Sequence, residues 1–323
     1  MLTNKESMKN FKRLLPTLMG LALLTGAAPR ISAWNGTGHM VVAEIAYDHL
    51  SPKTKAAVNG LLLQHRDYGL WMSEMPAGYT DKPRWAFLKA ATWPDDIRKT
   101  PDDRPIWHYI DLPVAAPGYA LTPAQKVIIA PNAQTQILAE TALLTAKTAT
   151  NQDKAVALCW VEHLIGDIHQ PLHTTSLFSA QFPNGDKGGN DETLAPGTVD
   201  ADPLEAAAHP HKLHALWDDL LGATRDPAEI AKIAALLEAG NDAKGVPTQV
   251  SLPRDLPRWL QETNALVQPY VYVNETLPMT PAGPEKAEVT LPPGYLATAH
   301  KVANRQVALA GLRLAGTLNA TAF

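Results

Sequence analysis

The chain has 323 residues and a formal net charge of −4, and Cys159 is its only cysteine. A chain of this length forms one large domain or two small ones with a sizeable core. The acidic balance argues against nucleic-acid binding through a broad basic face, and a single cysteine excludes an intrachain disulfide.

Residues 1–33 have the pattern of a secretory signal peptide: basic residues, then an apolar run, then small residues before Trp34. A membrane anchor is the alternative, but the apolar stretch 14–28 is shorter than the roughly 20 residues that span a bilayer. We therefore predict a signal peptide over 1–33, a mature domain over 34–323, and a secreted or periplasmic protein without stable membrane association. Removing the leader's charge of +4 leaves the mature chain at −8.

Along the mature chain, apolar residues recur at helical spacing, while alternating, strand-like runs are scarce. Ser51-Pro52 and Thr122-Pro123 are typical helix starts. The fold class predicted from these patterns is all-α, with a single globular helical domain. Its expected helices cover 38–50, 52–65, 132–148, 153–170, 209–222, 226–238, 254–268 and 294–318.

Three stretches lack clean periodicity, at 66–84, 93–121 and 174–203. Loops of this length in a compact domain tend to be functional or mobile, so we expect them to rim a site. The segment 276–293 contains Pro and Glu residues, and we expect it to be a surface excursion before the last helix.

Two histidine–aspartate pairs have a spacing of four residues, His163 with Asp167 and His214 with Asp218. Residues four apart lie on one face of a helix, so each pair presents a nitrogen and an oxygen to a common point. His163 and Asp167 share the apolar face of their predicted helix, where an aspartate is costly unless it is paired or metal-bound. A buried His–Asp hydrogen bond without metal is the alternative. The second pair and a nearby third histidine, His173, favour metal.

Further donors lie upstream, in separate segments, at His39, Asp95 and His108. A histidine on an apolar face, as His39 is, more often belongs to the core than to a metal site. However, cleavage before Trp34 would leave a free α-amino group five residues away, which could chelate a metal together with its own carbonyl. This set of donors indicates a hydrolase with more than one zinc ion.

Six motifs occur in order along the chain after Trp34: Gly38-His39, TWPDDIR at 92–98, WHYIDLP at 107–113, HLIGDIHQPLH at 163–173, GGN at 188–190 and LHALWDD at 213–219. Together they resemble the zinc-dependent single-strand nuclease family, the nuclease S-one/P-one family, also called type I nucleases. The resemblance spans nearly the whole mature chain.

The resemblance implies a trinuclear zinc site at the centre of the helical domain. One zinc would be held by Asp95, His108, His163 and Asp167, a second by His173, His214 and Asp218, and a third by the Trp34 amine and carbonyl with His39 and Asp167. Asp167 would therefore bridge two ions, which requires both of its oxygens.

The same resemblance implies roles for four other residues. Asp111 would orient the attacking water, and Arg98 would neutralise charge on the phosphoryl oxygens. A structural Arg–Asp ion pair is the alternative for the arginine. Tyr109 would stack on a base, and Asn190 would hydrogen-bond it.

The implied activity is hydrolysis of single-stranded DNA and RNA to 5′-phosphorylated products, with 3′-nucleotidase activity, by a monomeric enzyme. The nearest alternative is a zinc-dependent phospholipase C, which typically has glutamate where Asp218 stands. An exported helical protein whose zinc ions only support the fold is a third interpretation, but such sites are usually cysteine-rich.

Overall fold

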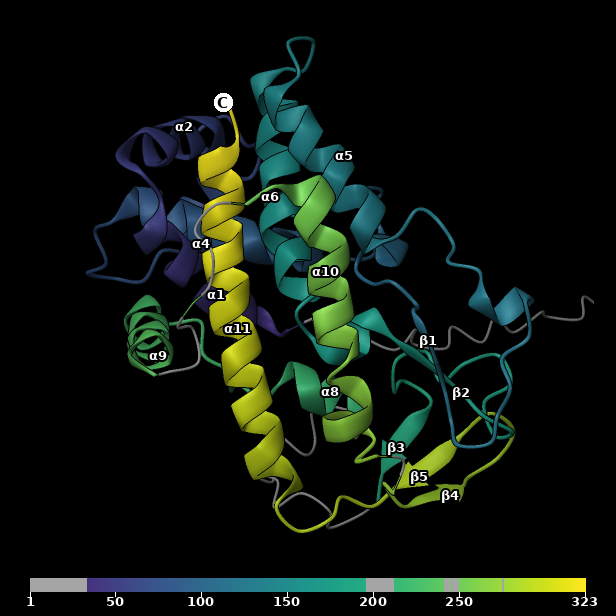
Figure 1. Ribbon diagram of the computed structural model, residues 1–323. Coiled ribbons are helices and arrows are strands. Elements are labelled where there is room, and N and C mark those ends of the chain that lie inside the picture. The colour runs from purple at the N-terminus through teal and green to yellow at the C-terminus, as the bar shows by residue number, and fades with distance from the viewer. Residues whose placement is uncertain (1–33, 196–211, 241–244, 246–249, 275) are drawn as a thin grey trace, which may run out of the picture. The chain divides into compact units, whose positions relative to one another are not determined.

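The computed structural model describes residues 34–195, 212–240, 245, 250–274 and 276–323. These residues belong to the unit Ile31–Phe323, and the predicted signal peptide lies outside the described residues. The unit is a mostly helical single domain, which confirms the predicted fold class (Figure 1). Its α-helices are α1 (Gly36–His49), α2 (Pro52–Leu62), α3 (Tyr68–Ser73), α4 (Lys82–Asp96), α5 (Ala133–Thr145), α6 (Asn151–Asp167), α8 (Leu213–Asp218), α9 (Pro227–Ala239), α10 (Leu252–Asn264) and α11 (Tyr295–Ala320).

Helix α1 lies at the centre, packed against α4, α6, α9 and the long α11 (Figure 1). All its residues from Thr37 to Tyr47 are buried. Its contact with α11 is close, because a Cβ at Gly311 would lie 2.6 Å from the Ile45 side chain. Local signals set the helix starts: Ser51 caps α2 as predicted, since its side chain accepts the Thr54 N–H.

Helix α4 was not predicted, although it carries one of the candidate ligands, Asp95. Every residue from Trp85 to Pro94 is buried, whereas Lys82, Pro83 and Asp96 at the ends of the helix are exposed. The short α3 also falls within a stretch predicted to be irregular. Conversely, Thr122-Pro123 precedes only a single 3₁₀ turn, η2 (Ala124–Lys126), and not the α-helix that we expected.

Five strands of three residues complete the described fold. Strand β1 (Pro113–Ala115) pairs in parallel with β2 (Ser176–Phe178), which ties two of the predicted loops together. Strands β3 (Glu192–Leu194), β5 (Ala287–Val289) and β4 (Met279–Pro281) form a second sheet in that order. Most residues of 276–293 are exposed, as expected of a surface excursion, and the segment also places the buried Ala287 and Val289 in this sheet.

The remaining turns are η1 (Pro105–Trp107), η3 (Pro171–Thr174) and the π-turn η5 (Val267–Val271). Turn η1 leads directly into His108, and η3 contains His173. Among the described helices, none combines the length and apolarity needed to cross a bilayer.

Candidate metal centre

The structure brings all the predicted ligand side chains into three buried groups. They come from α1, α4, α6, η3, α8 and the residue after η1. Within each group, one ligand atom per residue lies within 4.8 Å of the others. The groups are His39, Asp95 and His163; His108, His163 and Asp167; and His173, His214 and Asp218.

Asp167 occupies the junction between α1 and the loop that carries His108. Its Oδ2 lies 3.2 Å from His108 Nδ1 and 3.4 Å from His163 Nε2. Its Oδ1 lies 3.3 Å from His39 Nε2. The two oxygens therefore face different imidazoles, which is the arrangement that a bridging carboxylate needs.

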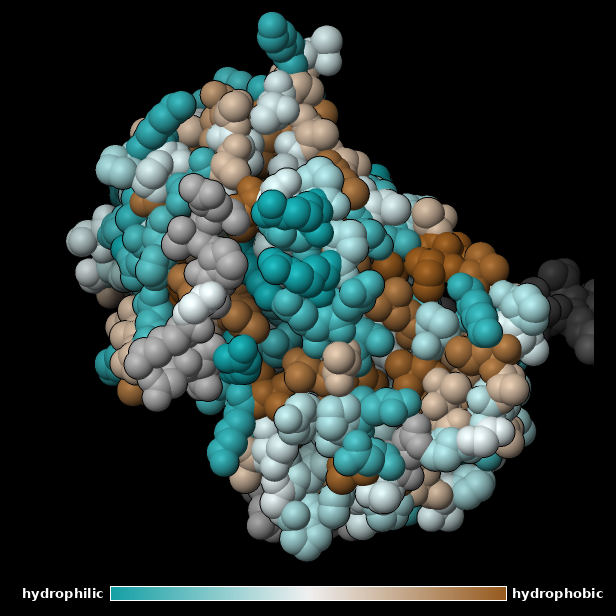
Figure 2. Space-filling model, viewed as in Figure 1, coloured by the Kyte–Doolittle hydropathy of each residue, from teal (hydrophilic) through white to brown (hydrophobic). Residues whose placement is uncertain are grey.

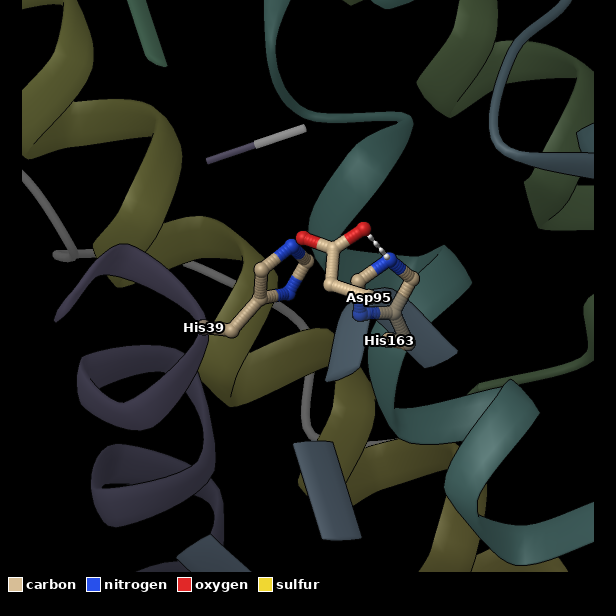
Figure 3. Close-up of side chains that lie close together, drawn as sticks. All are labelled: His39, Asp95 and His163. Carbon is tan, nitrogen blue, oxygen red and sulfur yellow. Dashed lines mark ion pairs between the residues drawn. The ribbon is translucent and has the colours of Figure 1, made fainter. Parts of the chain in front are cut away.

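Asp95 completes this part of the centre from the last turn of α4. Its Oδ1 lies 3.7 Å from His163 Nε2 and 3.8 Å from His108 Nδ1. Figure 3 shows its carboxylate beside the rings of His39 and His163. Those two rings stack, with centroids 3.8 Å apart. Glycine at position 166 permits this approach, because a Cβ there would lie 2.9 Å from His39 Nδ1.

The third group joins η3 to α8. His173 Nε2 lies 3.1 Å from His214 Nε2, and the Asp218 oxygens lie 3.8 Å and 3.5 Å from these two nitrogens. Gln170 orients the Asp218 carboxylate, since its Nε2 donates to Asp218 Oδ1 at 2.7 Å.

Hydrogen bonds to main-chain carbonyls orient three of the histidines. The Nδ1 atoms of His163, His173 and His214 lie 2.8, 2.7 and 2.6 Å from the carbonyl oxygens of Ala91, His108 and Gly188. Each Nδ1 must carry the proton, so each neutral Nε2 presents a lone pair to the centre. Two such lone pairs face each other between His173 and His214, which is repulsive unless a cation lies near both. This donor set therefore fits a metal ion.

The effect of burial on the pKa values of these side chains also favours a bound metal ion over charged side chains without one. Burial lowers the pKa of His39 and His108 well below the ordinary value, with His163 as the next contributor for both. It raises the pKa of Asp167 and Asp218 well above the ordinary carboxyl value. Both nitrogens of His39, Nε2 of His108 and Oδ1 of Asp167 have no hydrogen-bond partner among the described residues. A cation would both ionise these carboxyls and satisfy these atoms.

Trp34 lies between the ends of α6 and α8. Its indole N–H donates to the Gly166 carbonyl at 3.1 Å, and the N–H of the next residue, Asn35, donates to the Asp218 carbonyl at 3.0 Å. The side chain of Trp34 is fully buried. The main chain of residue 34 is thereby anchored next to two of the candidate ligands.

A comparison with known protein families agrees with this centre. The model of the S1/P1 nuclease family matches residues 34–322, which is most of the chain. The chain belongs to the S1/P1 nuclease family. It is therefore an endonuclease and a hydrolase, as the resemblance predicted.

Several plant proteins are similar to this nuclease over most of their length. Endonuclease 2 of Arabidopsis thaliana is 26% identical over 97% of this chain and 99% of its own. Endonuclease 3 of the same plant is 24% identical, over 94% of this chain and 93% of its own. Endonuclease 5 is 25% identical, over 94% and 95%.

Two further residues of this nuclease have predicted roles, Arg98 and Asp111. The half-buried Arg98 donates from Nη2 to Asp95 Oδ1 at 2.5 Å, which is the ion pair named as the alternative to a catalytic role. Asp111 is exposed at a cleft that Tyr109 also lines. The protein around the Asp111 carboxyl group removes part of its hydration, and this desolvation raises its pKa to about 6. The negative charge of Asp186 contributes less in the same direction.

Asn190 is placed differently from the expectation of a free base-binding amide. It is buried, and its Nδ2 donates to the Lys187 carbonyl at 2.8 Å, so the side chain braces its own loop. Tyr109 is half-buried beside His108. The base-binding roles of both residues stay predictions.

Sequence reasoning missed the residues that support this loop. Asp186 accepts the N–H groups of Leu177, Gly188 and Gly189 at 2.7, 3.0 and 2.9 Å. Gly188 has φ +60°, and a Cβ there would lie 2.3 Å from the Leu172 carbonyl oxygen, so glycine is required. Because Gly188 accepts from His214, Asp186 indirectly orients that histidine. An aspartate two residues before a glycine pair is typical of such a turn, and this signal was available.

Gln170 was also missed, and it gives a test of the third group. Its Oε1 accepts the Leu172 N–H at 2.5 Å, which forces its Nε2 toward Asp218. We expect Gln170→Met to weaken metal binding at His173, His214 and Asp218 by about 10- to 100-fold, as loss of an outer hydrogen-bond partner typically does. Competition with a chromogenic chelator measures this affinity. Gln261→Met, at an exposed glutamine of α10, is the control, and equal affinities in the two variants would contradict the role of Gln170.

Proposed function

We propose that this nuclease hydrolyses single-stranded DNA and RNA to 5′-phosphorylated products with three zinc ions, and that it also acts as a 3′-nucleotidase. The observation that carries the proposal is the position of Asp167, whose two oxygens face His39 on one side and His108 with His163 on the other. Adjacent metal ions around one carboxylate are the arrangement used to hydrolyse phosphate esters.

Zinc is favoured by the chemistry of the donors. Imidazole nitrogens suit zinc, and a mixed His and Asp set without cysteine is typical of catalytic rather than structural zinc sites. Asp95, His108, His163 and Asp167 would hold one ion, His173, His214 and Asp218 a second, and His39 and Asp167 with the main chain of Trp34 a third. Ions held there supply positive charge beside the phosphoryl group and make a nearby water more acidic.

The protein's own residues would position the reactants. Asp111 lies three residues after His108 at the edge of the centre, where its carboxylate could accept a proton from the attacking water. Arg98 holds Asp95 through Nη2. The other N–H groups of its guanidinium can approach phosphoryl oxygens, so a positioning role and charge neutralisation are compatible.

The pH dependence of hydrolysis tests the role of Asp111. Its pKa is raised to about 6, so the carboxylate form is populated above that pH and lost below it. We expect kcat/KM to fall on the acid side of about pH 6, and Asp111→Asn to lower kcat by about 10²- to 10⁴-fold and to remove this limb. Asp102→Asn, at an acidic residue paired with Arg66, should keep the wild-type profile. An unchanged acid limb in Asp111→Asn would assign the titration to another group.

Selectivity for single strands would follow from Tyr109 beside His108. A base that stacks on this ring must give up its pairing and stacking with other bases, which is costly in a duplex but not in a single strand. Asn190 would contribute through its carbonyl oxygen or by shaping the loop. Because the mature chain is acidic, affinity for the anionic strand must come from the centre itself.

We also propose that residues 1–33 are removed on export, which makes the protein secreted or periplasmic, and that the mature enzyme is a monomer. The decisive experiment incubates zinc-loaded mature protein with denatured DNA, RNA, duplex DNA, a 3′-nucleotide and phosphatidylcholine. Release of 5′-phosphorylated products from the single strands, and phosphate from the 3′-nucleotide, is expected. Turnover of the lipid alone would overturn the proposal.

A further inference from the structure

An exposed apolar strip, Val127–Ile129, follows the 3₁₀ turn η2. Val127, Ile128 and Ile129 are 64, 37 and 78% exposed. Three consecutive exposed β-branched residues are unfavourable in water, so such a run indicates a surface that contacts something apolar. In Figure 2, hydrophobic surface gathers on the side of the molecule where the chain runs from η2 toward α5.

A cleft of about 500 Å³ lies beside this strip. Val127 and Ile129 line it together with Ile106, Phe178, Tyr109 and Asp111. The last two residues are those proposed to act on the substrate, so the cleft shares two lining residues with the proposed reaction site. Its volume lies within the range of small-molecule pockets.

The side-chain amides that line the cleft are engaged with protein groups. Gln125 donates to Tyr119 Oη and to the Pro183 carbonyl, Asn132 to the Ile129 carbonyl, and Asn184 to Glu285. These amide N–H groups brace the walls, and the strip and Ile106 offer a ligand apolar surface. A weakly hydrated group, such as the face of a base, therefore fits this cleft.

We propose that the strip and its cleft bind an unpaired base of the substrate strand, next to the nucleotide that is cleaved. Bases taken out of a stack are held between aromatic or apolar side chains, which recognise their faces and not their sequence. Lys126, immediately before the strip, is exposed and makes no ion pair with the described residues, so its ammonium is available to a backbone phosphate. This inference rests on the proposed function and adds a subsite to it.

Other occupants fit less well. The net charge of −8 on the mature chain opposes approach to an anionic bilayer. A second copy of the chain would need a total buried area of roughly 1,200–2,000 Å², which a strip of three side chains does not approach. A strand of nucleic acid that is already held at the metal centre needs only one or two such contacts.

The test compares Val127→Ser/Ile129→Ser with the wild type on a single-stranded dodecanucleotide and on a 3′-nucleotide. We expect KM for the dodecanucleotide to rise about tenfold with unchanged kcat, because one base loses its stacking surface. The 3′-nucleotide, which has no second base to place on the strip, should keep both constants. Leu236→Ser, at a leucine of α9 that is 73% exposed, is the matched control and should change neither substrate. Val127→Ile/Ile129→Leu should retain the wild-type KM.

Binding of a fluorescent dodecanucleotide, measured by anisotropy, separates this proposal from the proposed function. If the wild type hydrolyses neither substrate, the proposed function fails, whereas about tenfold weaker binding by the serine variant would still support the subsite. Equal KM and equal binding in the serine variant and the wild type would overturn the subsite. The subsite would also be overturned if the serine variant lost binding to phosphatidylglycerol vesicles, or no longer formed dimers in light scattering, while its oligonucleotide binding stayed equal to that of the wild type.

Discussion

Asp167→Asn is expected to remove at least one metal equivalent from the mature protein and to lower nuclease activity by more than about 100-fold. Removing a residue that hydrogen-bonds to a metal ligand typically lowers metal affinity or activity by up to about 100-fold. Removing a bridging ligand itself should lower them more. An amide carries no negative charge, and its NH₂ group would face either His39 or the pair His108 and His163, each of which lies 3.2–3.4 Å from an Asp167 oxygen. Metal analysis and hydrolysis of denatured DNA measure the two effects.

Glu162→Gln is the matched control for this variant. Glu162 lies on the same helix, α6, and is fully buried. Burial raises the pKa of Glu162 well above its ordinary value, and glutamine keeps the size of this side chain without an acidic group. We expect unchanged metal content and activity. Full metal content in Asp167→Asn, with circular dichroism like that of the wild type, would rule out a bridging role.

A Gly-Ser extension before Trp34 is expected to remove a second kind of metal contact and most of the activity. Residue 34 is anchored between Gly166 and Asp218 by the indole and by the next N–H, so a free α-amino group would project into the region of His39 and Asp167. The extension converts this amine to an amide nitrogen, which does not coordinate at neutral pH. We expect loss of about one metal equivalent and a loss of activity of more than about 100-fold.

The same extension placed after Phe323 is the control. It adds equal length at the other terminus and should leave metal content and hydrolysis unchanged. N-terminal mass determination of each protein establishes which residue comes first. If the N-terminally extended protein binds as much zinc and cleaves as fast as the mature protein, the terminal amine is not a ligand, and the role of leader removal in activity falls with it.

The two His–Asp pairs show how far sequence periodicity reaches. A spacing of four residues places His163 with Asp167, and His214 with Asp218, on one helix face, and the pairs lie 3.4 and 3.5 Å apart. Helix geometry is local, so no tertiary information is needed for this step. Likewise, the spacing of apolar residues predicted most helices, whereas α4, in which every residue from Trp85 to Pro94 is buried, was missed.

The resemblance to a family supplied what periodicity could not. Asp95, His108 and His39 lie on elements with no local relation to α6, and only the family's motifs placed them together before the structure was known. His169 shows that a histidine close to the ligands in the sequence need not be a ligand. It is a histidine beside the ligands, yet its ring binds the Ile165 carbonyl and Arg313, away from the centre.

Some residues only position a ligand side chain or its loop. Neither the periodicity nor the family resemblance predicted their roles. Gln170, Asp186 and Gly188 lie in or beside motifs of the sequence, but their importance depends on which atom each one contacts, and the motifs do not show this. Asn190 illustrates the same difficulty, since its amide donates to the Lys187 carbonyl, a contact that the motif does not show. A motif identifies a residue type at a position, and the direction in which its side chain points depends on packing.

The sequence by itself determined the helical class, the His and Asp donors and their pairing within helices, because these depend on spacing along a single element. Only the tertiary structure decided that Asp167 faces two sets of imidazoles, that carbonyls of distant segments orient the histidines, and that an apolar strip borders Asp111. Each of these depends on the approach of segments far apart in the chain, and that approach is set by the packing of buried side chains.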